Sequence, residues 1–141
     1  MIKKLLHTGG YPESINVSLL LIRLITGGFM LTHGYGKFLM LIGDSPIQFA
    51  DPIGIGATAS LALTVFAEFF CSIFLILGFA TRLSTIPLLI TMLVAAFIVH
   101  ARDGFGKQEL ALIYATAFLV LAIAGAGKLS VDKWMLERIL K

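Results

Sequence analysis

Four apolar stretches in the sequence are each close to the length that a helix needs to cross a bilayer. They cover residues 15–42, 55–80, 83–101 and 110–126. About 20 apolar residues in a helix span the roughly 30 Å of hydrocarbon in a membrane. Isolated strands cannot satisfy their backbone groups in lipid, so each stretch is predicted to be a helix. The predicted fold is therefore an all-α integral membrane protein, an antiparallel bundle of four transmembrane helices.

Composition supports this class and excludes several others. Hydrophobic residues make up 58% of the 141 residues and charged residues 13%, against about 45–50% and about 25% in soluble domains. A mean hydropathy of +0.97 excludes disordered and nucleic-acid-binding tails, which need low hydrophobicity or dense charge. We expect one membrane domain over residues 1–141, with the lipid bilayer as its partner and no nucleic acid.

The segments outside the four stretches have the chemistry of turns and of one short surface helix. Turn residues occur at 43–46, 51–54, 78–84 and 102–107, and the glycines at 125 and 127 are typical of a helix end. Ser130 can cap a final helix over residues 131–140, with Asp132 in its first turn. Trp134 beside basic residues is typical of a segment at headgroup level, which predicts an interfacial helix.

The charges predict an orientation. Four spans place both termini and the second connection on one side of the membrane. The basic residues of that side are Lys3, Lys4, Arg82, Lys128, Lys133, Arg138 and Lys141. The basic residues of the other side are accompanied by Asp44, Asp51, Asp103 and Glu109. The positive-inside rule then predicts that both termini are cytoplasmic. No apolar signal segment follows Lys4, so we expect the N-terminus to be retained.

Ionisable residues within the apolar stretches are the first candidates for function. They are Arg23, His33, Lys37, Glu68 and His100. A charge at the centre of a spanning helix costs about 2.5–3.5 kcal/mol on insertion scales, so each should face the bundle interior and have a partner. Counting the helical rise places Arg23 and Glu68 within side-chain reach of each other. Such a pair could have the purely structural role of holding two helices together. Alternatively, it could accompany proton transfer through Glu68.

A second group of polar residues is predicted near the outer surface. Its members are His33, Lys37, His100 and Glu109. His33 and Lys37 are four residues apart and share one helix face. The four would form a cavity open to the outside, with Glu68 beneath it and Arg23 below that. In the alternative interpretation the long side chains only reach the headgroups and the histidines cap loops.

Metal and redox chemistry can be judged from the same residues. His33 and His100 on facing helices could serve as axial ligands of a b-type haem, which is a weaker hypothesis because both are near the surface. They lack carboxylate or thiolate partners at tight spacing, so no metal site is predicted. Cys71 is the single cysteine. An intrachain disulfide relay is thus excluded, and any redox role needs a borrowed group.

The order of these residues along the chain resembles the DoxX family of small bacterial four-helix membrane proteins, over nearly the whole length. The residues that carry the resemblance are Arg23, His33, Gly34, Lys37, Glu68, Gly78, Thr81, Arg82, His100, Gly125, Ala126, Gly127, Ser130 and Asp132. The resemblance implies a bacterial inner-membrane protein, an oxidoreductase or a quinone-linked subunit. Relatives resemble parts of terminal oxidase, thiosulfate:quinone oxidoreductase and redox-defence complexes, or eukaryotic assembly chaperones. It implies no established catalytic residue.

The leading hypothesis is a membrane redox subunit that binds a quinone-like carrier and acts with a partner protein. His33 and Lys37 would donate to a quinone carbonyl, and Glu68 would relay the proton. His100 is a second acid–base candidate, and Arg23 and Glu109 complete the predicted cofactor-binding set. The alternative is a non-catalytic assembly factor, chaperone or scaffold subunit, which the lack of a cofactor motif favours. A transport function is a weaker hypothesis because no inverted repeat is evident. Whether the chain forms a homo-oligomer is left open.

Overall fold

The computed structural model describes residues 8–139, in which four helices are long and apolar enough to span a membrane. The first span is α2 (Glu13–Ile42), and the second joins α3 (Ala57–Val65), η1 (Phe66–Cys71) and α4 (Ser72–Leu77). The third joins α5 (Thr81–Val94) to η2 (Ala95–Val99), the fourth is α6 (Phe105–Ala124), and α7 (Val131–Ile139) follows. The predicted all-helical fold with four antiparallel spans is confirmed.

The start of the fourth span corrects the prediction that residues 102–107 form a connection. Helix α6 begins at Phe105, because Gly104 adopts a left-handed backbone (φ +83°) and ends the turn there. The backbone N–H of Lys107 already donates to the carbonyl of Gly104 at 3.2 Å. The polar first turn of α6 hides the helix start from a search for apolar residues, so the predicted span began too late.

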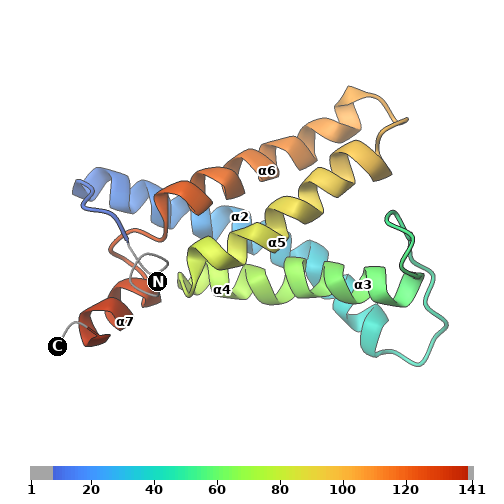
Figure 1. The fold of residues 1–141 in the computed structure, drawn as a ribbon, viewed down its shortest axis with the longest axis horizontal. Coiled ribbons are helices and arrows are strands. Elements are labelled where there is room, and N and C mark those ends of the chain that lie inside the picture. The colour runs from blue at the N-terminus through green and yellow to red at the C-terminus, as the bar shows by residue number, and fades with distance from the viewer. Residues whose placement is uncertain (1–7, 140–141) are drawn as a thin grey trace.

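The spans pack as two pairs, α2 along the second span and α5 along α6. Figure 1 shows the pairs diverging toward the end that carries the loop 43–56 and the turn after η2. Buried apolar side chains fill the middle of the bundle, including Met30, Leu75, Leu88, Phe118 and Leu121. Large apolar side chains on the opposite helix faces are exposed, as expected for a surface in contact with lipid.

Arg23 is fully buried, with 1% of its surface exposed. Contrary to the prediction, it does not pair with Glu68. Its guanidinium donates to the carbonyls of Leu75 (3.1 Å) and Ile76 (3.2 Å) at the end of α4. It also donates to the carbonyls of Ala126 and Leu129. The last carbonyls of a helix lack intrahelical donors, and α4 stops at Gly78 in the left-handed conformation. Arg23 therefore joins α4 to the segment before α7.

Helix α7 is attached to the turn between the second and third spans. Ser130 caps it as predicted, because its hydroxyl accepts the N–H of Lys133 at 3.2 Å. Asp132 lies in the first turn of α7, but its buried carboxylate accepts the N–H groups of Ala80 (2.6 Å) and Thr81 (2.9 Å). Asp132 thus caps α5 rather than its own helix.

Some predictions concern position in the membrane or residues outside the described range. The placement of α7 at the interface stays a prediction. Lys3, Lys4, Lys141 and the predicted last residue of the final helix, Leu140, lie outside the described residues 8–139.

Candidate functional site

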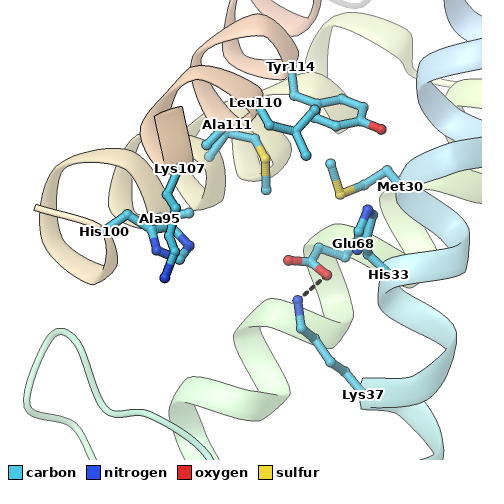
Figure 2. Close-up of a pocket in the computed structure, with 11 residues that line it drawn as sticks. Met30, His33, Lys37, Glu68, Ala95, His100, Lys107, Leu110, Ala111 and Tyr114 are labelled. Carbon is cyan, nitrogen blue, oxygen red and sulfur yellow. Dashed lines mark hydrogen bonds and ion pairs between the residues drawn. The ribbon is translucent and has the colours of Figure 1, made fainter. Parts of the chain in front are cut away.

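An ion pair between Lys37 of α2 and Glu68 of η1 lies at the diverging end of the bundle. The Lys37 ammonium donates to Oε2 of Glu68, and Figure 2 shows the two side chains reaching toward each other from the two helices. The Glu68 side chain is 4% exposed and that of Lys37 28%. A carboxylate buried to this extent needs a cationic partner or a proton. Lys37, rather than Arg23, provides the partner.

Close approach of the two helices makes this pair possible. A Cβ atom on Gly34 would lie 2.5 Å from the carbonyl carbon of Glu68 and 2.6 Å from the backbone nitrogen of Phe69. Glycine is therefore the residue that lets the backbone of α2 contact that of η1. Lys37 is three residues further along α2, on the same side of the helix, and is carried to the Glu68 carboxylate.

Two segments of π-helix border the site. Glu68 lies within η1, and η2 ends the third span just before His100. The N–H of His100 donates to the carbonyl of Ala95 at 2.9 Å, which closes the wider turn. Single π turns inside α-helices are rare and frequently occur at functional sites. These two π-helical segments were not predicted from the sequence.

Two neighbouring cavities surround the ion pair. The first has a volume of about 180 Å³ and is drawn in Figure 2; its lining includes Met30, His33, Met92, Lys107, Leu110, Ala111 and Tyr114. The second has about 250 Å³, and its lining includes Phe49, Ala50, Pro52, Thr64, Thr91, Val94 and Val99. Both are also lined by Lys37, Glu68, Ala95 and His100. The shared residues make them two parts of one polar cleft.

The cleft gathers some predicted site residues and leaves out others. His33, Lys37, Glu68 and His100 all line the first cavity, which lies between α2, the second span, η2 and α6. Glu109 is exposed and lines neither cavity, because α6 presents the face of Lys107, Leu110, Ala111 and Tyr114. The prediction that Glu109 lines this cavity is therefore corrected, and Arg23, predicted below Glu68, lies further along α2, toward its start, and lines neither cavity.

Tyr114 and Lys107 are cavity residues that the sequence analysis missed. Tyr114 is buried and points into the cavity from α6 in Figure 2. Within residues 8–139 its hydroxyl has no hydrogen-bond partner. Seven residues separate Lys107 from Tyr114, which corresponds to about two helical turns and a shared face. That spacing was a usable signal, but it required the correct start of α6.

The two histidines of the site differ in their surroundings. His33 has no hydrogen-bond or ion-pair partner among the described residues, and Figure 2 shows it beside Glu68. Nδ1 of His100 lies 2.8 Å from Oδ2 of Asp103, and Lys107 lies 3.7 Å from the same oxygen. The hydrogen bond from His100, helped by the charge of Lys107, lowers the pKa of the Asp103 carboxyl. Asp103 thereby orients the His100 ring and leaves its other nitrogen available.

The loop after α2 is fastened at the outer side of the second cavity. The Asp51 carboxylate accepts the hydroxyl of Ser60 at 2.7 Å and the N–H groups of Gly56 (2.7 Å) and Ile55 (3.0 Å). These hydrogen bonds lower the pKa of Asp51, and the one from Ser60 has the largest effect. Asp51 holds the turn that precedes α3, whose N-cap is Gly56, and it fixes the loop segment whose Phe49, Ala50 and Pro52 line the cavity.

The chemistry available in the cleft follows from these groups. Lys37, Lys107, His33 and Tyr114 are hydrogen-bond donors at one cavity, and Glu68 is the carboxylate among them. Within the described chain no group of three or more His, Cys, Asp and Glu is placed to hold a metal ion. The cleft suits a ligand with carbonyl or anionic oxygens, and Glu68 and the histidines could exchange protons with it.

Comparisons with known proteins agree with the membrane fold. The family model described as DoxX matches residues 18–101. An uncharacterized membrane protein of Mycobacterium tuberculosis is 30% identical over 96% of this chain and 88% of its own length. Inner membrane protein YqjF of Escherichia coli is 28% identical over 84% of this chain and 92% of its own length.

A further relative carries a functional name. CatD of Bacillus subtilis, provisionally named as an oxidoreductase, is 26% identical over 89% of this chain and 92% of its own length. No solved structure matches the chain significantly.

Proposed function

The chain belongs to the DoxX family of membrane proteins, and we propose that it binds a quinone-like redox carrier in the cleft around Lys37 and Glu68. The observation that carries the proposal is the convergence of several donors on a buried carboxylate, inside helices that span a membrane. The name of CatD as an oxidoreductase supports the same class of activity.

The size and polarity of the cleft fit a quinone headgroup. Small-molecule sites usually have volumes of about 300–1,000 Å³, with few polar groups in an otherwise apolar lining. The first cavity has about 180 Å³ and the second about 250 Å³. Each is small alone, but their combined volume falls in the lower part of that range. Met30, Met92 and Leu110 contribute apolar surface for a ring, and the donors lie beside it.

A bound quinone supplies the capacity to take up electrons together with protons. The chain contributes donors and a proton carrier. Lys37 and His33 donate to the carbonyl oxygen and stabilise the negative charge that develops there, because donors already in place need no reorganisation. Glu68, the carboxylate beside Lys37, is the group that would pass a proton to or from the ligand. His100, oriented by Asp103, is the second group that can donate or accept a proton.

The electrons need a source outside this chain. Cys71 is the single cysteine, so no dithiol within the chain can deliver them. We therefore assign the role of donor or acceptor to a partner redox protein. In our proposal the whole chain is one domain of the bacterial inner membrane with both termini cytoplasmic, so that the cleft lies in the outer half of the bilayer.

A non-catalytic assembly or scaffold subunit is the second candidate. The observation that favours it is Arg23, a buried charge whose hydrogen bonds all go to backbone carbonyls and serve the fold. The Lys37–Glu68 pair could hold α2 against η1 in the same way. A client protein would then contact the exposed apolar faces, and the cleft would bind no carrier.

The test is the identity of what the purified protein retains. Protein in native lipid nanodiscs would be examined by reduced-minus-oxidised absorption spectra, then by organic extraction and mass spectrometry. Variants Glu68→Gln and His33→Ala remove one group each from the cleft. Glu137→Gln is the matched control, because it removes an exposed carboxylate on α7.

We expect near-stoichiometric quinone in the parent and in Glu137→Gln, and loss of quinone in the two cleft variants. A haem spectrum in place of quinone would overturn the proposal in favour of His33 and His100 as axial ligands. Only bulk lipid in the parent would also overturn it and favour the scaffold role.

A further inference from the structure

A third cavity of about 100 Å³ lies between the second and third spans. Its lining is Pro52, Ile53, Ser60, Leu63, Thr64, Ile90, Thr91 and Val94. Pro52, Thr64, Thr91 and Val94 also line the second cavity of the cleft. The gap between α3 and α5 therefore adjoins the second cavity, with these four residues common to both linings, and none of the residues that line the gap belongs to α6.

The outer edge of this third cavity faces lipid. Leu63 on α3 is 56% exposed and Ile90 on α5 is 55% exposed, while Thr64 and Thr91 beside them are half-buried. With a rise of 1.5 Å per residue, Thr64 lies roughly 10 Å below the outer end of α3 and Ile90 roughly 14 Å below the end of η2. At those depths a spanning helix is surrounded by hydrocarbon rather than by headgroups.

Polarity increases from this edge toward the cleft. Leu63 and Ile90 line the third cavity but not the second, Thr64 and Thr91 line both, and the Lys37–Glu68 pair lines the second but not the third. The loop fastened by Asp51 contributes Phe49 and Pro52 on the outer side. A molecule that matches this sequence of surroundings has a polar head and a long apolar tail.

We infer that the gap between α3 and α5 is a lateral opening to the bilayer, through which an amphipathic lipid places its head beside Glu68 while its hydrocarbon tail stays in the membrane. The inference rests on the proposed function for the nature of the headgroup, a quinone. It adds that the ligand is long-tailed, that it enters from the membrane, and that Thr64 and Thr91 border the tail.

The experiment compares two probes that share a headgroup. Decylubiquinone carries an apolar tail, and the same benzoquinone headgroup without a tail can reach the first cavity past the exposed His33 and Lys107. Binding of each would be measured in nanodiscs with the parent, with Leu63→Phe and with Ile90→Phe, which narrow the opening from opposite walls and lie outside both cavities of the cleft. Leu93→Phe is the control, because Leu93 is exposed on α5 and lines none of the three cavities.

We expect both narrowing variants to bind the tail-less probe within about twofold of the parent and decylubiquinone at least about tenfold more weakly. Leu93→Phe should bind both probes like the parent. Unchanged decylubiquinone affinity in both narrowing variants would overturn the lateral opening and leave the proposed function intact. An equal loss of both probes would overturn it too, because the substitutions would then act on the headgroup site. If the parent binds neither probe, the proposed function itself fails and the lateral opening falls with it.

Discussion

Gly34 and Glu68 are in such close backbone contact that a Cβ atom on Gly34 would lie 2.5 Å from the carbonyl carbon of Glu68. We expect Gly34→Ala to lower stability by about 1–3 kcal/mol, because one of the two backbones must move. The same movement would separate Lys37 from Glu68. Thermal unfolding in detergent measures the effect.

Gly36→Ala is the matched control for that substitution, since no atom lies within 4 Å of a Cβ at this position of the same helix. It should leave stability unchanged or raise it by up to about 1 kcal/mol, because alanine favours a helix more than glycine. Equal behaviour of the two variants would argue against the close contact.

The Lys37–Glu68 pair should show strong coupling between its members. Removing one partner of a buried pair commonly costs about 3–5 kcal/mol, and Lys37→Met should cost less than that because the lysine is partly exposed. Glu68→Gln should cost less than Lys37→Met, since it leaves no unpaired charge buried. The double variant should be more stable than the sum of the single effects predicts. Additive effects in a double-mutant cycle would contradict a direct pair.

Arg23 should tolerate no replacement by lysine. A single ammonium cannot reach both Leu75 and Ala126, whereas the planar guanidinium has donors directed to each. We expect Arg23→Lys to lower stability by at least about 2 kcal/mol, because buried carbonyls lose their donors. Arg138→Lys on the exposed face of α7 should stay within about 0.5 kcal/mol of the parent. Similar melting temperatures for the two variants would show that the Arg23 contacts contribute little.

Asp132→Ala should loosen α7 from the turn before α5. The substitution removes the cap on the N–H groups of Ala80 and Thr81, for which caps elsewhere contribute about 0.5–2 kcal/mol. Hydrogen exchange at Thr81 and in α7 should increase, while exchange in the distant α6 start should not. An equal increase of hydrogen exchange in all helices would contradict a local role for Asp132.

Asp51 should make the loop 43–56 sensitive to acid. Its pKa is lowered in the folded protein by the hydrogen bonds from Ser60, Gly56 and Ile55. A lowered pKa means that the carboxylate stabilises the fold above the ordinary aspartate pKa of about 3.9, and that this contribution is lost as pH falls through the lower folded value. The melting temperature of Asp51→Asn should therefore fall less steeply than that of the parent as the pH is lowered into the acid range. Asp44→Asn in the same loop is the control and should keep the slope of the parent.

The four spans were predictable because a bilayer requires helices of a certain length and apolarity. Both properties can be read from consecutive residues of the sequence. The gathering of His33 and Lys37 was predictable for the same reason, since helical spacing places them on one face. The cap by Ser130 also follows from its position before α7. Each of these predictions depends on residues that are neighbours along one helix.

The partners of the buried charges could not be predicted in this way. Depth along a helix placed Arg23 below Glu68 and within side-chain reach of it, but depth does not say which direction a side chain faces around the helix axis. That direction depends on the contact of Gly34 with η1 and on the π turns, which no local pattern encodes. Glu109 failed for the same reason, because its level along the helix was predicted but not the face of α6 on which it is exposed.

The π turn of η1 has a rotational consequence for the second span. A π turn holds one residue more than an α turn, so it rotates everything beyond it by about 100° relative to an uninterrupted α-helix. The half held by Arg23 at Leu75 and Ile76 and the half that bears Ser60 and the exposed Leu63 are therefore offset relative to the positions they would have in a regular α-helix of the same sequence. Deleting a single residue between 66 and 71 would remove the π turn and leave both halves on their present faces, whereas a deletion elsewhere in the span would rotate one half against the other by about 100°. The angular setting of the carboxylate at 68 thus depends on the number of residues in this segment as much as on their identity.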